Sequence, residues 1–308
     1  MSPPPSFTIH RPESADDLAA LEPLIAEIFG PRDRPQGWFE RKLQREVVDL
    51  ALSGIARSGR GDMLGVVLVG SPPSLPGTAQ IVSLGVLGHF QGIGCGRMLL
   101  RAAVSAARSH GHERLTALAE PHRTRFYAAA GFEATLSQKT LLVSTPGTPE
   151  GPPIPLRELP PAPWDRPLSQ PVGGWLEEAW MRTPQAKRQT IAIGGENPWA
   201  WAHISIEGHA RLIHRLLIDA RIPPDTRPKQ VLTACKVLRQ ALTATGPLLF
   251  YGLPTVSRIT DALLREGWQN AQESTLMVHS LIKTAAVDVG TDRRQVATAR
   301  VIMAPDRR

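Results

Sequence analysis

Cysteine, lysine and long apolar runs are all scarce in this chain. Only two of its 308 residues are cysteines, Cys95 and Cys235, and they lie far apart without the spacing of a metal site. A disulfide-built scaffold is therefore excluded, and we expect no bound metal and a reduced, cytoplasmic setting. No apolar run approaches the roughly 18–20 residues of a transmembrane helix. The first residues, MSPPPSFTIH, also lack the basic and apolar regions of a secretory signal, so we expect no membrane association.

The positive charge of the chain comes almost entirely from arginine. The net charge is +7, with 29 arginines and only 6 lysines. No block of five like charges occurs, and basic residues are not interleaved with aromatic ones, so the pattern does not indicate a nucleic-acid partner. A scattered solvated surface would account for it, although a modest basic excess also suits a ligand that carries phosphates. Neither feature indicates an oligomeric state.

Hydrophobic patterning predicts the same series of strands and helices twice. In the first half we expect strands at 7–11, 63–70, 79–87 and 114–119, helices at 14–29, 38–52, 94–110 and 122–130, and a hairpin at 132–143. In the second half we expect helices at 174–181, 231–245 and 255–266, strands at 190–193, 200–208, 210–220 and 248–251, and a strand pair at 268–281.

A proline-rich stretch separates the two series. Ten prolines lie between Pro146 and Pro171, so this stretch cannot form a helix and should be an extended connection. We therefore expect a first domain at 1–145, a linker at 146–171, a second domain at 172–283 and a polar tail at 284–308.

Short identities support a duplication. Ala130-Gly131-Phe132 matches Glu266-Gly267-Trp268, and Thr140–Val143 matches Thr275–Val278, at offsets of 135–136 residues. A period this long indicates two copies of a domain and not a solenoid of short repeats. The alternative is that two helix–glycine–aromatic–strand junctions arose by chance.

A glycine-rich turn between a buried strand and a helix carries the strongest chemical signal. Residues 84–97 read LGVLGHFQGIGCGR. Glycines at 92, 94 and 96 let several backbone amides face one anion, and the helix N-terminus adds its dipole there. No Lys-Ser/Thr follows, as a P-loop requires, and the G-x-G-x-G spacing does not fit a dinucleotide fingerprint. The turn therefore predicts a pyrophosphate cradle, the alternative being a merely flexible strand–helix connection.

These residues resemble a known family. Gln91-Gly92-Ile93-Gly94-Cys95-Gly96 is similar to the Q/R-x-x-G-x-G/A signature of the GNAT superfamily of N-acyltransferases, and Leu84-Gly85-Val86 resembles the end of that family's fourth strand. Residues 125–132 (RFYAAAGF) resemble its second signature, a helix with Tyr four residues before Gly-Phe. The resemblance extends over residues 7–143, and over the second half only through the duplication. It implies an α/β (α+β) fold of two GNAT-like domains, each a mixed, mostly antiparallel sheet flanked by helices.

The resemblance also implies an activity. It would be an N-acetyltransferase that moves an acetyl group from acetyl-CoA to an amine of a small molecule or peptide, by direct attack in a ternary complex. In such an enzyme the Val86 backbone N–H would polarise the thioester carbonyl and Tyr127 would protonate the leaving thiolate. The implied cofactor-binding residues are Leu84, Val86, Gln91, Gly92, Ile93, Gly94, Cys95, Gly96 and Arg97.

Three departures from the family pattern leave a second function open. Residues 79–87 carry no carboxylate, Glu120 stands where members often have Asn, and Gly88 stands where Pro is usual. The general base is therefore open among His89, Glu120, His122 and a water chain. A non-catalytic acyl-CoA-binding or regulatory protein is the alternative function.

The second half has lost both chemical features in the sequence. A shift of about 134 residues puts Gly94 on Pro228 and Gly96 on Gln230, and the equivalent of Tyr127 is Leu263. Proline has no N–H to offer an anion. Six of the seven tryptophans follow residue 145. Trp199 and Trp201 are expected on one face of a strand, either in core or inter-domain packing or lining a substrate surface.

Overall fold

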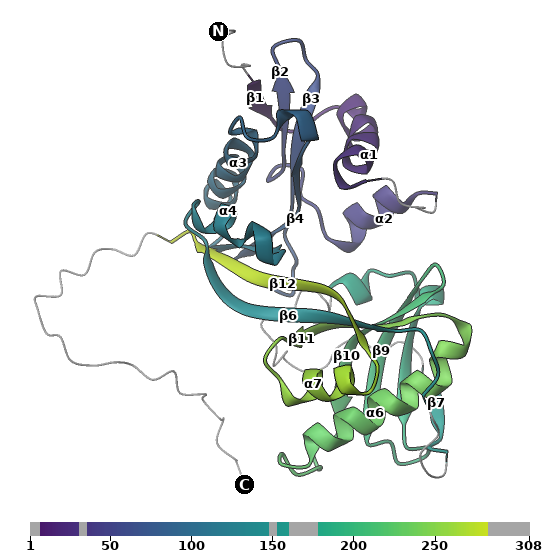
Figure 1. Cartoon of the computed structure of the whole chain (residues 1–308). Helices are drawn as coiled ribbons and strands as arrows, with labels where there is room; N and C mark the ends of the chain where they lie inside the picture. The colour runs from purple at the N-terminus through teal and green to yellow at the C-terminus, as the bar shows by residue number, and fades with distance from the viewer. Residues whose placement is uncertain (1–6, 31–35, 148–152, 160–177, 283–308) are drawn as a thin grey trace, which may run out of the picture.

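The computed structural model describes residues 7–30, 36–147, 153–159 and 178–282, which form one continuous sheet with two lobes (Figure 1). The sheet has 12 strands in the order β1-β2-β3-β4-β5-β12-β6-β11-β10-β9-β8-β7. Within these residues no helix is both long and apolar enough to cross a lipid bilayer. Most of the expected linker, the start of the expected helix at 174–181 and the whole expected tail lie outside the described residues.

From their second strand onward, the two halves of the chain repeat one order of strands and α-helices. The first half contains β1 (Phe7–His10), α1 (Ala15–Phe29), α2 (Trp38–Arg45), β2 (Gly54–Ser58), β3 (Met63–Gly70), β4 (Thr78–Val86), α3 (Cys95–Ser109), β5 (Arg114–Ala119), α4 (Thr124–Ala128) and β6 (Glu133–Val143). The second half contains β7 (Leu156–Leu159), β8 (Arg188–Ile193), β9 (Ala200–Glu207), β10 (Ala210–Ile218), α6 (Arg227–Leu242), β11 (Leu248–Pro254), α7 (Arg258–Arg265) and β12 (Gln269–Ser280).

Strand directions confirm the mixed, mostly antiparallel fold and the duplication. Only β4–β5 and β10–β11 pair in parallel, and these two pairs occupy the same place in each half. The helices α4 and α7 end in the same way, with positive φ at Gly131 and Gly267. After these glycines, Phe132 N donates to Tyr127 O at 3.2 Å and Trp268 N donates to Leu263 O at 3.1 Å. This shared helix end shows that Tyr127 and Leu263 are equivalent positions.

Local sequence explains several elements directly. Ser14 caps α1, and Asp17 in the first turn completes a capping box with it, as expected from the Ser14 signal. Buried residues alternate between two cores across β3: Val67 and Val69 face α3, whereas Val66 and Leu68 face α1 and α2. Both faces of this strand are therefore covered, which is why it reads as an unbroken apolar run.

Four sequence predictions need correction. The expected helix at 38–52 ends at Arg45, because Val47 adopts a positive φ of 50° and Val48 pairs with Gly70 of β3. The short strands β2 and β7 were not predicted; β2 lies between β1 and β3, and β7 lies inside the expected linker, where it pairs with β8. Their few residues give little alternation to detect.

The expected hairpin at 132–143 and the expected strand pair at 268–281 are also wrong. Each is one long strand, β6 or β12, without a glycine or proline at which it could turn. Instead the two strands pair with each other, antiparallel, and cross between the lobes (Figure 1). β12 lies between β5 and β6, and β6 lies between β12 and β11, so the strand next to each half's parallel pair comes from the other half.

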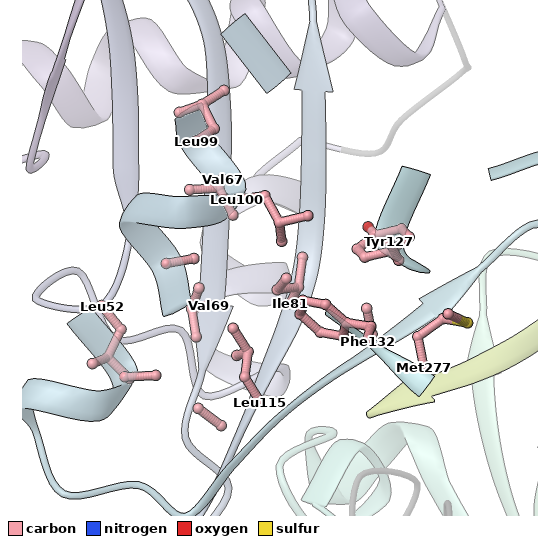
Figure 2. Packing of buried hydrophobic residues seen from close by; sticks show 14 of the residues in the cluster. Leu52, Val67, Val69, Ile81, Leu99, Leu100, Leu115, Tyr127, Phe132 and Met277 are labelled. Atoms are coloured by element: carbon pink, nitrogen blue, oxygen red, sulfur yellow. The ribbon is translucent and has the colours of Figure 1, made fainter. Parts of the chain in front are cut away.

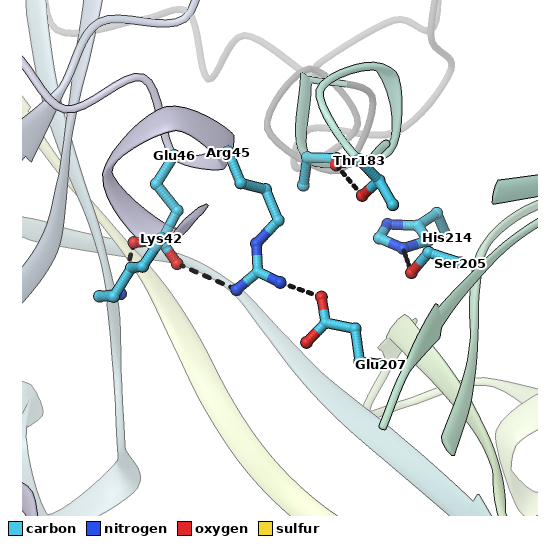
Figure 3. A network of polar contacts seen from close by, with 8 residues as sticks. Lys42, Arg45, Glu46, Thr183, Ser205, Glu207 and His214 are labelled. Carbon is cyan, nitrogen blue, oxygen red and sulfur yellow. Dashed lines mark hydrogen bonds and ion pairs between the residues drawn. The ribbon is translucent and has the colours of Figure 1, made fainter. Parts of the chain in front are cut away.

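The exchange also joins the two hydrophobic cores. Met277 of β12 is buried in the first core (Figure 2), and Leu141 and Val143 of β6 are buried in the second. Gln138 pairs with Ser274, which is 136 positions later, so equivalent residues of the two copies meet where the strands cross. Farther out, Arg45 of α2 forms an ion pair with Glu207 of β9 (Figure 3). The halves thus share main-chain pairing, core packing and charge contacts.

Leu141→Ala should lower the free energy of unfolding by about 2–5 kcal/mol, because it removes a fully buried side chain and leaves a cavity. Met277→Ala should give a loss of similar kind from the first core. Urea denaturation followed by tryptophan fluorescence would measure both. Leu142→Ala is the matched control, since Leu142 is only half-buried, and its loss should be smaller. Equal, small losses at Leu141 and Leu142 would mean that β6 is not part of the second core.

Candidate functional site

The parallel strands β4 and β5 separate partway along their length. They pair only from Thr78 to Ile81 on β4, although β4 continues to Val86. On the other side of β4, the pairing with β3 shifts register between Ile81 and Ser83, so that Val82 is the extra residue of a β-bulge. A bulge bends and twists its strand. This one lies directly after the last residue paired with β5, and it turns the end of β4 away from β5.

The backbone of β4 presents its polar groups to the resulting split. Leu87 N donates to Leu64 O at 2.9 Å, so the pair Leu87–Leu64 is hydrogen-bonded across to β3. Because antiparallel ladders alternate, the N–H and C=O groups of Val86 and Leu84 point away from β3 and into the split. Within the split, Gln91 Nε2 donates to Val86 O at 3.1 Å. Two predicted binding residues, Leu84 and Val86, therefore offer main-chain hydrogen bonds there.

The glycine turn lies just beyond the split. Gly92 and Gly94 have φ angles of 81° and 94°, which explains why glycine is required, and a Cβ at either position would meet no atom within 4 Å. Gly94 is the N-cap of α3 and offers no side-chain cap. The first bond of the helix runs from Met98 N to Gly94 O, so the amides of the first turn have no intrahelical acceptor. An open, glycine-lined helix N-terminus fits a pyrophosphate group.

Two further residues of the turn are placed differently. Ile93 is exposed, whereas the side chain of Cys95 is only 1% exposed and packs in the first core. Burial raises the pKa of the Cys95 thiol. A raised pKa disfavours the thiolate, so Cys95 is a small packing residue and not a nucleophile.

Close packing brings the turn, the split and α4 together. A Cβ on Gly96 would lie 3.6 Å from both the Phe126 ring and Cγ2 of Val86. On the opposite face of β4, a Cβ on Gly85 would lie 2.3 Å from Cγ2 of Ile28, so Gly85 lets α1 approach the strand. In the Leu84-Gly85-Val86 motif, the backbone polar groups of Leu84 and Val86 thus face the split, and Gly85 allows the close contact with α1.

Tyr127 stands beside this junction, in α4. Its ring makes edge contacts with Phe126 at 5.3 Å and Phe132 at 5.5 Å between centroids, and it shares a core with Ile81 and Met277 (Figure 2). Burial raises the pKa of the Tyr127 hydroxyl to about 12, against a smaller lowering by Arg123. The hydroxyl has no hydrogen-bond partner among the described residues, yet it is not one of their buried unpartnered atoms. It therefore retains access to solvent and can donate a proton.

The three candidate bases are all exposed. His89 lies in the short turn after β4, and its ring is 4.2 Å from that of Phe90. Glu120 and His122 follow the end of β5 and face each other at 3.6 Å. All three side chains thus lie at the end of the sheet where β4 and β5 diverge, but the geometry does not single out one of the three as the general base.

The second half keeps the split but not the cradle. The pairing of β10 with β11 ends at Ile213 and Phe250. The next residue, His214, is the extra residue of a β-bulge, as Val82 is in β4. Its Nε2 lies 2.7 Å from Oγ of Ser205 (Figure 3). Eight residues separate β10 from α6 and β4 from α3, so the two turns align at an offset of 132.

This offset corrects the sequence alignment. Gly94 corresponds to Thr226 and Gly96 to Pro228, two positions away from the residues expected at an offset of 134. Thr226 has a φ of −92°, so the turn takes a different path. The guanidinium of Arg227 donates to Ile222 O and Ala220 O, both at 3.0 Å, and fills the turn from within. The second turn therefore has no place for a pyrophosphate.

Two of the described tryptophans in the second half pack in the protein interior. Trp199 directly precedes β9 and packs against the second core, while Trp201 lies within β9 and is half-buried. Trp180 is fully buried, and its Nε1 donates to Ile204 O at 3.2 Å. Trp199 therefore contributes to core packing.

Tyrosine ionisation tests this environment. Tyr127 and Tyr251 are the only tyrosines, and burial raises the pKa of both. Because the folded pKa of Tyr127 is about 12 and the unfolded value is about 10, its contribution to stability is complete below pH 10 and is lost as the pH rises towards 12. Absorbance at 295 nm should therefore show less phenolate near pH 10 in the folded chain than in the unfolded one. Tyr127→Phe should remove the component near 12, and a tyrosine that ionises at pH 10 with the fold intact would contradict the buried site.

Known proteins provide an independent comparison. Residues 18–132 match the sequence model of the Acetyltransferase (GNAT) family. No curated protein matches the chain significantly.

Solved structures match over nearly the whole length of the chain. A putative acetyltransferase from Pyrococcus horikoshii has a TM-score of 0.64 at 12% identity, over 89% of this chain and 89% of that one. A GCN5-related N-acetyltransferase from Sphaerobacter thermophilus has a TM-score of 0.63 at 15% identity, over 90% and 96%. A tandem GNAT protein from the clavulanic acid biosynthesis pathway has a TM-score of 0.55 at 14% identity, over 91% and 99%. Residues 18–132 thus match the GNAT acetyltransferase family model, and the described residues have the fold of a tandem GNAT protein, with a second copy that lacks the glycine turn.

Proposed function

We propose that this protein is an N-acetyltransferase that uses acetyl-CoA and acylates an amine of a small molecule or peptide. The observation that supports this most directly is the split between β4 and β5, which presents the backbones of Leu84 and Val86 and leads to the open N-terminus of α3. Fold alone would not support an activity, because related folds host different functions. Both cysteines are free and buried, which suits the cytoplasmic setting that we also propose.

The residues of the first half fit the donor in two places. The amides from Gly92 to Arg97 would hold its pyrophosphate, where no side chain blocks the approach. The amide-bearing pantetheine arm would lie in the split and add a strand-like partner to the free edge of β4, through Leu84 and Val86. Gln91 would keep the strand end and the turn together through its bond to Val86 O.

The transfer needs one bond made, one bond broken and two protons moved. The amine nitrogen attacks the thioester carbonyl carbon, the new C–N bond forms, and the C–S bond breaks. An N–H of β4, from Val86 or Leu84, would stabilise the negative charge that develops on the carbonyl oxygen. Tyr127 would give its proton to the leaving thiolate, and the amine would lose a proton to Glu120, His122, His89 or water.

Burial of Tyr127 affects this step in two ways. A pKa of about 12 keeps the hydroxyl protonated at neutral pH, but it also makes the group a weaker acid. The thiolate would form in the same dry surroundings, which raise its basicity as well. Donor and acceptor would therefore remain matched, which is the condition for efficient proton transfer.

A non-catalytic acyl-CoA-binding or regulatory protein is the second candidate. Two observations favour it: β4 carries no carboxylate, and the three candidate bases are exposed. Release of CoA from acetyl-CoA in the presence of a panel of amines separates the two functions. Tight binding without release for any amine would support the second candidate.

Acetyl-CoA should bind once per chain, because only one of the two turns has open amides. Gly96→Gln should weaken binding more than tenfold, since its long side chain would start between Val86 and the Phe126 ring and occupy space where the turn, the split and α4 meet. Gly96→Ala is the matched control, because a Cβ there makes only ordinary contacts at 3.6 Å. Calorimetric titration would measure both affinity and stoichiometry. Two sites of similar affinity, or normal binding by the Gln variant, would show that the cradle has been misplaced.

Tyr127→Phe should lower kcat by about 10²–10⁴-fold if chemistry limits the rate, while the dissociation constant of acetyl-CoA changes little. The reason is that the lost proton matters only as the thiolate leaves. Tyr127→Leu, which copies the second half, should be at least as damaging. Tyr251→Phe is the control, since this tyrosine lies on β11 of the second half, and it should leave kcat unchanged. Unchanged turnover in Tyr127→Phe, with chemistry shown to be rate-limiting, would remove Tyr127 from the mechanism.

A further inference from the structure

Acidic residues are absent from the part of the chain that surrounds the glycine turn. No Asp or Glu occurs between Asp62 and Glu113. Residues 63–132 carry six arginines and only two carboxylates, a net charge of +4, whereas the whole chain of 308 residues has a net charge of +7. More than half of the excess positive charge thus falls in less than a quarter of the chain. The excess comes from the scarcity of carboxylates, two of the 28 in the chain, because six of its 29 arginines is an ordinary share for a stretch of this length.

Four of these arginines are exposed around the glycine turn. Arg97 and Arg101 lie one turn apart on α3, about 6 Å along its axis, and Arg123 and Arg125 lie at the start of α4. The two pairs flank one contact, since a Cβ on Gly96 would lie 3.6 Å from the Phe126 ring, and Arg97 follows the first of these residues while Arg125 precedes the second. We call these four residues the arginine cluster.

None of the four arginine side chains has an ion pair or hydrogen bond with any described residue. Other arginines of the chain do have such partners, for example Arg57 with Asp17 and Arg221 with Asp219. Arg97 is also in the first turn of α3, where a cation opposes the helix dipole and where no acidic residue compensates. An unpaired group of like charges repels itself, and a bound polyanion would relieve that repulsion.

The position of the cluster identifies the anion. The pyrophosphate of CoA would be held by the main-chain amides, and the pantetheine arm would extend from it into the split. The adenosine end of CoA, which carries a 3′-phosphate, must then extend outward from the turn. There the exposed side chains of Ile93 and Met98, 39% and 42% exposed, offer apolar surface next to Arg97 and Arg101. Guanidinium groups bind phosphate bidentately and retain their charge at any working pH.

We propose that the arginine cluster binds the 3′-phosphate of CoA and makes the protein selective for CoA over donors that lack this group. The inference rests on the proposed function, because it requires the pyrophosphate to lie at Gly92–Arg97. The arginine cluster would thus distinguish donors with a 3′-phosphate from donors without one, which the main-chain cradle cannot do. The cradle itself would hold any diphosphate.

The experiment compares CoA with 3′-dephospho-CoA by calorimetry, in the wild-type chain and in three variants. The wild type should bind CoA about tenfold more tightly than 3′-dephospho-CoA, and the preference should shrink as salt rises. Arg97→Ala/Arg101→Ala and Arg123→Ala/Arg125→Ala should each reduce the preference, with a smaller loss of affinity for 3′-dephospho-CoA, because its pyrophosphate also carries negative charge. That second affinity also shows that the variants are folded. Arg114→Ala, an exposed arginine at the far end of β5, should keep the full preference.

Each other outcome overturns the inference in a recognisable way. If the wild type binds CoA and 3′-dephospho-CoA equally, the cluster does not read the 3′-phosphate, although the cradle and the proposed function stand. If neither double variant changes the preference, the phosphate is read elsewhere. If 4′-phosphopantetheine binds as tightly as CoA, the adenosine end contributes nothing, and a carrier protein that bears this arm becomes the better partner. If none of these compounds binds, the proposed function fails together with the inference.

Discussion

The antiparallel crossing of β6 and β12 is the contact on which the rest of the molecule depends. β5 forms one wall of the split and is paired with β4 only as far as Ala117, so its other edge must be held firmly. That edge pairs with β12 along the whole of β5, and β12 belongs to the second half. The position of β5, and therefore the width of the split, is thus set by a strand from the copy that lacks the cradle. The second half thus contributes to the site through this strand.

Comparison of the halves separates what the fold requires from what the chemistry requires. Both copies keep the parallel pair, the bulge that ends it and the eight-residue turn before the next helix. These features shape the sheet. Only the first copy has positive-φ glycines in the turn and a tyrosine at the end of α4; the second has Thr226 and Leu263 in the equivalent places. The second copy thus keeps the split without the glycine turn and the tyrosine. The split is therefore a property of the fold, and the cradle is an addition to it.

The sequence predicted those parts of the structure that depend on neighbouring residues. The cap at Ser14, strand β3 and the glycine turn before α3 follow from local pattern and from residue chemistry. The exchange of β6 and β12 was missed, since pairing partners more than 130 residues apart leave no local signal. The alignment of Gly94 with Pro228, two residues from its true counterpart Thr226, has a related cause. A single offset of about 134 was applied to two copies that differ in loop length. The inward direction of Arg227 and the split-facing backbones of Leu84 and Val86 depend on register, which the sequence does not display.

The two turns also show that positive charge alone does not make a phosphate site. The first turn of α6 is as basic as that of α3, with Arg227 and Lys229 and no acidic residue. Yet Arg227 is bound to carbonyl groups of its own turn, and Arg221 is paired with Asp219 beside it. The side chains of Arg97 and Arg101 at α3 have no such partners, and the amides next to them are open. An anion would find unpaired charge and free donors together only in the first half, which is why selectivity for a phosphate-rich donor should belong to that half alone.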